Sequence, residues 1–113
     1  ECVLPGESAE EVLVSTHVCH PSLANDNLSG ISTATWLAKT LAALPKRRYT
    51  YRFVFIPATI GAIAWLSQRQ DVTKRVVHGV VISGVGDAGA GAGAARVGGP
   101  GAFPGRGVSR VLT

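Results

Sequence analysis

A short run of the sequence gathers most of the side chains that could do chemistry. Residues 17–30 contain two imidazoles, His17 and His20, together with the Cys19 thiol and the Asp26 carboxylate. Neutral imidazole and carboxylate are natural zinc ligands in hydrolytic sites. A short loop that contains a proline separates His20 from Asp26, so the chain could fold back and bring both side chains to one ion.

Each of these residues also has a purely structural interpretation. Asp26 lies where a helix is expected to begin, so its carboxylate could cap free backbone amides instead. His17 ends an apolar strand and could be a hydrogen-bonded core histidine, and a lone buried thiol is commoner than a ligand for Cys19. No CxxC or HExxH spacing indicates a zinc finger or a metalloprotease helix. The residue types by themselves leave both interpretations open.

Three segments with strand character would position this run. Residues 11–17 and 50–56 are rich in β-branched and apolar side chains, and residues 76–83 are almost continuously apolar. Strands that are apolar on both faces are typical of sheets covered by helices. The first strand would end at His17, so the run would lie at the carboxyl edge of the sheet, where sites in open α/β folds collect.

Two predicted helices connect these strands. In residues 28–43 apolar side chains recur at helical spacing, and Asn27 or Ser29 can cap the start. Residues 59–68 show a similar apolar face. The order strand, helix, strand, helix, strand predicts a three-layer α/β fold with a mixed or mostly parallel sheet and right-handed crossovers.

The end of the sequence has a different character. Most of the chain's 14 glycines lie there, without helical or strand periodicity. Such a segment buries too little apolar surface to offset its backbone entropy. We therefore expect a partial α/β domain at 1–87 and a Gly/Ala-rich, disordered tail at 88–113. A reading-frame change in GC-rich coding DNA can produce a similar switch, so it is a hypothesis, not a conclusion, that the tail is not native.

Charge and composition narrow the class of protein. The net charge of +4 and pI of about 9.6 make a basic nucleic-acid-binding module one alternative, but the basic run 46–48 has no interleaved aromatic ladder. Nucleic acid is therefore a disfavoured partner. Two cysteines and no stretch of 18 apolar residues predict a cytoplasmic protein without a membrane partner.

The first residue is not Met, which suggests that the sequence is a piece of something longer. Nothing at the start resembles a signal peptide. A three-stranded piece would leave sheet edges uncovered, so self-association through an edge strand is a further expectation.

The run 17–30, followed by a helix, resembles the metal-binding stretch of the bacterial DUF4910 aminopeptidase-like family. That family is related to the M28 zinc peptidases, in which an Asn-Asp-x-x-Ser-Gly turn follows a metal-binding histidine. The matching turn here is Asn25-Asp26-Asn27-Leu28-Ser29-Gly30. Residues 51–67 resemble the family's next strand and helix, and the resemblance extends from about Glu10 to Asp87.

The resemblance implies a metal site and a reaction. By position it makes His20 and Asp26 the leading metal ligands and His17 a second histidine candidate. Asp26 would bridge the metals if two zinc ions bind instead of one. For the intact family it implies a peptide or amide substrate, with a role in peptide processing or polysaccharide biosynthesis.

One position departs from the family pattern. Between Pro57 and Thr59 the family places a glutamate, where this chain has Ala58. In the related peptidases, acidic residues in this region hold the metal or activate the attacking water, and a methyl group can do neither. We therefore expect a fragment of a zinc-dependent aminopeptidase-like hydrolase that is catalytically impaired, with its catalytic residues unknown. The alternative is a non-catalytic remnant that binds a metal or a partner.

Overall fold

The computed structural model describes residues 1–86, 95–98 and 110–112, the last two ranges by their backbone only. The strands are β1 (Cys2–Leu4), β2 (Glu11–His17), β3 (Thr50–Ile56), β4 (Val76–Val81), β5 (Ala95–Gly98) and β6 (Arg110–Leu112). The helices are α1 (Gly30–Ala42), α2 (Ile60–Gln68) and α3 (Gln70–Thr73). An irregular turn, η1 (Ala24–Ser29), precedes α1.

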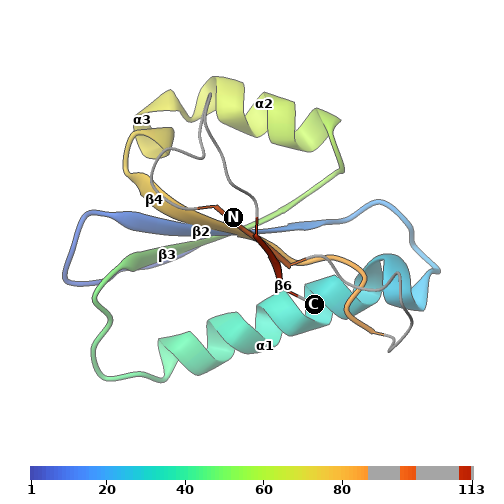
Figure 1. Ribbon diagram of the computed structural model, residues 1–113, viewed down its shortest axis with the longest axis horizontal. Coiled ribbons are helices and arrows are strands. Elements are labelled where there is room, and N and C mark those ends of the chain that lie inside the picture. The colour runs from blue at the N-terminus through green and yellow to red at the C-terminus, as the bar shows by residue number, and fades with distance from the viewer. Residues whose placement is uncertain (87–94, 99–109, 113) are drawn as a thin grey trace.

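The strands form one mixed sheet in the order β1-β3-β2-β4-β5-β6. β2 pairs in parallel with both β3 and β4, whereas β1 is antiparallel to β3. Helix α1 covers one face of the sheet, and α2 and α3 lie over the other (Figure 1). The prediction of a three-layer α/β fold with a mixed sheet is confirmed, and β2 is its central parallel strand.

The predicted elements agree closely with the observed ones at the first two strands. β2 and β3 have the predicted bounds, while β4 ends at Val81, two residues before the predicted end. Helix α1 begins at Gly30 and not at residue 28, because η1 has non-helical backbone angles at Asp26 and Asn27. The sequence patterns did not predict β1, which is short, or α3, a single turn.

The predicted tail at 88–113 lies mostly outside the described residues. Within it the structure describes the backbone of β5, antiparallel to β4, and of β6, antiparallel to β5. Neither strand was expected from the sequence, because glycine-rich segments lack the side-chain pattern that marks a strand.

The tightest packing lies between the sheet and α1. Val14, Ala34, Phe53 and Ile82 form the buried cluster on this side. Because side chains alternate along a strand, Val14 and Thr16 of β2 point to the α1 face and the intervening residues point to the α2 face. The alternation places His17 on the α2 face.

The α2 face is packed more loosely. No residue of α2 is buried, and Ile60 and Ile63 are 73% and 64% exposed. None of the helices in the described part of the chain is long and apolar enough to cross a membrane.

Candidate functional site

Three predicted ligands meet where β2 ends. His17 is the last residue of β2, and η1 carries Asp26 back toward it. The His17 Nε2 atom lies 2.6 Å from Asp26 Oδ1, and His20 Nε2 lies 3.5 Å from Asp26 Oδ2. The Asp26 and His20 side chains are about half exposed, at 51% and 48%. The Asp26 carboxylate and the His20 imidazole are therefore open to solvent, whereas the His17 side chain is only 21% exposed.

The opposite nitrogen of His17 also has a neighbour. His17 Nδ1 lies 3.5 Å from the hydroxyl of Ser83, just beyond β4. A second contact of this kind restrains the ring orientation of a histidine and favours one tautomer. Ser83 was not among the predicted site residues. Its position at the end of the third predicted strand was a usable signal, since adjacent parallel strands end at the same edge of the sheet.

The donor set fits a zinc ion in kind. Two imidazoles and one carboxylate are a common ligand set of catalytic zinc, which keeps a fourth position open. In the structure the donor atoms contact one another directly. Among the described residues, no group of three or more His, Cys, Asp or Glu side chains already surrounds a common point as metal ligands do. Small side-chain rotations would have to separate His17 and His20 from Asp26 on binding.

Asn27 anchors the turn that carries Asp26. Its side chain is 1% exposed, and its Nδ2 group donates to Thr16 Oγ1 at 2.8 Å and to the His17 carbonyl at 2.9 Å. Its Oδ1 atom accepts from the backbone N–H of Gly84 at 3.2 Å. Asn27 therefore joins the ends of β2 and β4, and Asp26 is held beside His17 as a consequence.

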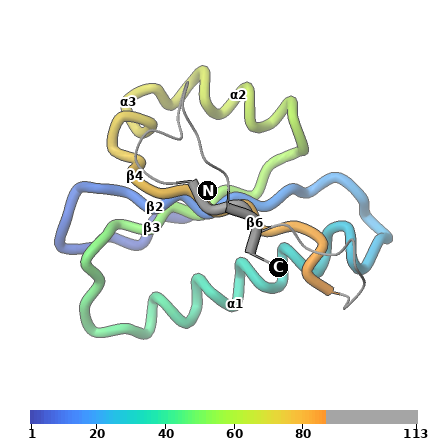
Figure 2. The backbone as a smooth tube through the Cα atoms, viewed as in Figure 1, coloured from blue at the N-terminus to red at the C-terminus, as the bar shows by residue number. Residues whose placement is uncertain are grey.

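The remaining polar residues of the turn bind the same segment after β4. Ser29 Oγ donates to the Asn25 carbonyl at 2.6 Å and accepts from the Val85 N–H at 3.2 Å. Asn25 Oδ1 accepts from the Gly86 N–H at 2.8 Å. Figure 2 shows these two stretches of chain side by side at one end of the molecule. The predicted turn-shaping role of these residues therefore corresponds to named hydrogen bonds.

Gly30 has a steric reason to be glycine. A Cβ atom at this position would lie 2.4 Å from Asn27 Oδ1 and 2.8 Å from the Ile82 carbonyl oxygen. Such distances are well inside van der Waals contact, and the Ile82 oxygen belongs to the backbone, so it cannot move aside cheaply. The absence of a side chain at Gly30 lets α1 begin directly against the Asn27 anchor.

The predicted capping roles are wrong. Ser29 occupies the N-cap position of α1 without a side-chain capping bond, and Asn27 uses its side chain to join β2 and β4. Asp26 lies against the two histidines. Cys19 is exposed and is not the buried thiol that is the commoner case for a lone cysteine.

Ala58, where the resemblance implies a glutamate, lies at the same edge of the sheet. Ile56 is the register partner of His17, and the Val18 N–H donates to the Ile56 carbonyl at 2.9 Å. Two residues on, Ala58 is exposed. Thr59 then has φ 57° and ψ −70°, and the Ile60 N–H donates to the Ala58 carbonyl at 2.7 Å. These angles and this bond define a γ-turn of the rare, strained form.

A second polar cluster lies at the opposite end of β2. Glu11 is 2% exposed, and its carboxylate accepts from Arg52 Nε at 2.6 Å and from Arg75 Nε at 3.0 Å. Burial would raise the pKa of the Glu11 carboxyl, but hydrogen bonds and charges from Arg52 and Arg75 together hold that pKa below its ordinary value. Glu1 contacts Arg52 and accepts from the Trp65 indole N–H at 2.7 Å.

Two residues of the basic run 46–48, Arg47 and Arg48, have partners within the protein. The Arg47 guanidinium donates to the Leu41 carbonyl at 3.0 Å and the Leu44 carbonyl at 3.1 Å, at the end of α1. Arg48 lies over the Tyr49 ring, 5.1 Å from its centroid. His78 meets the edge of the same ring at 5.8 Å. Its register partner is Val12, near the start of β2, so His78 lies away from the candidate site.

Comparison with known proteins gives concordant results. The model of a family described as a domain of unknown function, DUF4910, matches residues 1–96. This match confirms the predicted resemblance and extends beyond its expected bounds of about Glu10 to Asp87 at both ends.

Two relatives from Clostridium acetobutylicum match at high identity. One, provisionally named a polysaccharide biosynthesis protein with an aminopeptidase-like domain, is 51% identical over 89 residues, which are 79% of this chain. The other is a crystal structure whose title provisionally calls it a peptidase, with 50% identity, a TM-score of 0.75 and 78% of this chain covered. The chain spans about a fifth of each relative, 20% and 21%.

Proposed function

Because this chain belongs to the DUF4910 family, we propose that it is the metal-binding segment of an aminopeptidase-like hydrolase domain. In this proposal His17, His20 and Asp26 bind zinc. The proposed substrate class is a peptide or amide, which the peptidase-like relatives support.

The convergence of His17, His20 and Asp26 at the carboxyl end of β2 carries the proposal. Residues nine positions apart in sequence bring Nε2 of His17 and Oδ1 of Asp26 to 2.6 Å. The turn between them is fixed by the buried Asn27. A buried side chain such as Asn27 that holds exposed polar groups in place is more typical of a ligand site than of a core contact.

The chemistry of such a site divides between the metal and the chain. When bound, zinc supplies Lewis acidity and lowers the pKa of a coordinated water to about 7. The chain's own residues hold the ion and orient the rings: Ser83 contacts His17, and Asn27 fixes the peptide that carries Asp26. A general base is still needed to take the proton from the attacking water.

Ala58 explains why we propose impaired catalysis. It lies beyond the carboxyl end of β3, the strand paired with β2, and directly before the γ-turn at Thr59. A carboxylate at this position would lie at the same sheet edge as His17. The methyl group of Ala58 cannot accept a proton. In this proposal the chain therefore binds a metal but does not hydrolyse its substrate efficiently.

Zinc calorimetry tests the metal site. We expect the purified chain to bind zinc with a dissociation constant at or below the micromolar range. The double variant His20→Ala, Asp26→Ala should lose this binding while keeping its circular dichroism spectrum. His78→Ala is the matched control, because His78 packs on Tyr49 away from the site. An unchanged zinc affinity in the double variant would refute the site.

A second candidate function is favoured by Ala58 itself. In this version the chain is a non-catalytic remnant that binds a metal or a partner, and the metal site has only an architectural role. The variant Ala58→Glu separates the two versions by hydrolysis of a chromogenic leucine anilide. A gain of zinc-dependent turnover supports the hydrolase origin of the site, whereas zinc binding without turnover in this variant favours the remnant.

A further inference from the structure

An apolar cavity lies between α2 and the sheet. Its volume is about 140 Å³. Helix α2 contributes Ala62, Trp65 and Leu66, and the sheet contributes side chains from its three parallel strands: Leu13, Ser15, Val54, Ile56 and Val81. The lining is almost entirely apolar, with the Ser15 hydroxyl as its polar exception.

The cavity lies on the same face of the sheet as His17 of the candidate metal site. Side chains two residues apart on a strand point to the same face, so Ser15 and His17 share the α2 face of β2. Their separation is a two-residue rise of about 6.6 Å. Ile56, which lines the cavity, is the register partner of His17, and Val81 is the register partner of Ser15. The end of the cavity therefore reaches the level of the histidine.

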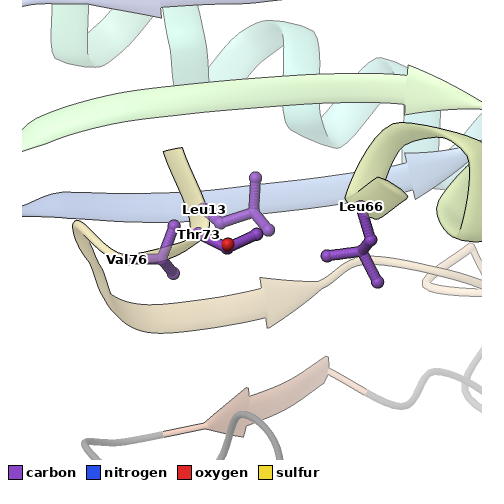
Figure 3. A pocket seen from close by; sticks show the side chains of 4 residues that line it. All are labelled: Leu13, Leu66, Thr73 and Val76. Carbon is purple, nitrogen blue, oxygen red and sulfur yellow. The ribbon is translucent and has the colours of Figure 1, made fainter. Parts of the chain in front are cut away.

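The other end of the cavity lies at Leu13 and Leu66. A smaller crevice of about 10 Å³, room for about one water molecule, lies beyond it and shares Leu13 and Leu66 with it. Figure 3 shows Leu13 and Leu66 with Thr73 and Val76 around this crevice, between the helices and the sheet. The cavity therefore extends along the α2 face of β2, from the level of Ser15 to Leu13.

We infer that this cavity receives an aliphatic side chain of the substrate residue that is bound at the His17–Asp26 site. The inference rests on the proposed function, whose site it extends. A leucine-like side chain attached to an amine or carbonyl beside His17 would lie along the α2 face of β2, over Ser15. A charged side chain is disfavoured, because the lining has no charged group that could pair with it.

The test compares L-leucinamide with glycinamide as probes of the purified chain, with and without zinc. The background variant Trp36→Phe removes the exposed tryptophan of α1, so that fluorescence reports Trp65 in the cavity wall. We expect leucinamide to bind at least about tenfold more tightly than glycinamide, since burial of an isobutyl group favours binding by that order. Binding should also shift the Trp65 emission.

A cavity-filling variant makes the test specific. Ala62→Leu adds a side chain to the cavity and should bring the leucinamide preference close to one while zinc binding is retained. Ala64→Leu is the matched control, because Ala64 is exposed on the same helix and does not line the cavity. The control should keep the preference.

Two results overturn the inference. One is equal binding of the two amides by the unmodified cavity. The other is a preference that survives in Ala62→Leu; if that variant only raises the thermal midpoint, the cavity is a packing void. Failure of zinc to bind would refute the proposed function separately, since the preference and its loss in Ala62→Leu are also measured without zinc.

Discussion

The central strand β2 carries a polar cluster at each end, and the two clusters differ in burial and in the chemistry of their charged partners. At its start, Glu11 is 2% exposed and is held by two arginines. At its end, the Asp26 side chain is 51% exposed and faces two histidines. Glu11 is paired with two guanidinium groups, which are always charged, whereas the partners of Asp26 are two imidazole rings.

The difference separates a structural cluster from a candidate site. A buried carboxylate needs full pairing, because an unpaired charge in the interior is costly. In the part of the chain that the structure describes, no buried side-chain nitrogen or oxygen lacks a hydrogen-bond partner. The exposed cluster has donor atoms that water can reach and that a metal could recruit. Four substitutions or conditions test this contrast.

The largest expected effect on stability is at the buried cluster around Glu11, at the start of β2. Glu11→Ala leaves Arg52, which is 7% exposed, without its main partner. Breaking a buried ion pair on one side costs about 3–5 kcal/mol of unfolding free energy. Urea denaturation should show this loss, and Glu10→Ala, an exposed neighbour, should show almost none. Similar midpoints for the two variants would contradict a structural role for Glu11.

The next effect concerns the anchor beneath the exposed end. Asn27→Ala removes three hydrogen bonds and leaves the His17 carbonyl and the Gly84 N–H without this partner. Unpaired buried groups predict a loss of about 2 kcal/mol, together with weaker zinc binding. Leu28→Ala is the control, because Leu28 is 47% exposed. Undiminished zinc affinity in a folded Asn27→Ala protein would show that the anchor does not position Asp26.

Acid should weaken the buried end next. The pKa of Glu11 is lowered from its ordinary value of 4.5 despite burial, because Arg52 and Arg75 stabilise the charged form, and the pKa of Glu1 is lowered as well. A lowered carboxyl pKa contributes stability that is complete above about 4.5 and is lost as the pH falls through the folded-state value. Thermal midpoints between pH 7 and pH 3 should therefore fall. In Glu11→Gln the fall should be shallower; an identical slope would exclude Glu11 as its source.

The smallest stability effect is expected at the exposed end. Asp26→Ala removes a half-exposed carboxylate, and such pairs contribute about 0.5 kcal/mol or less. Zinc binding should nevertheless be lost. A stability loss as large as that of Glu11→Ala would mean that the Asp26 cluster is structural and would remove the contrast between the two ends.

The sequence pattern was sufficient to predict the bounds of the central strands, but it did not predict where the turn before α1 ends. β2 and β3 have their predicted bounds because each is a compact run rich in β-branched and other apolar side chains. The start of α1 was misplaced, since Asn27 and Ser29 are good capping residues whose side chains bind distant groups instead. Those partners lie more than fifty residues away, and local propensity carries no information about them.

The sequence by itself determined the family, the three-layer α/β order and the three residues that could hold a metal. His17, His20 and Asp26 were candidates from their chemistry and from the resemblance, and zinc binding by them remains a prediction. Only the tertiary structure decided that both histidines contact the one carboxylate and that Glu11 is buried at the other end of β2. It also decided that Ser83, just after β4, contacts His17 and that Asn27 of η1 joins the ends of β2 and β4. The physical reason is that parallel pairing brings segments that are far apart in sequence side by side. A pattern along the sequence carries no information about which distant residues then come into contact.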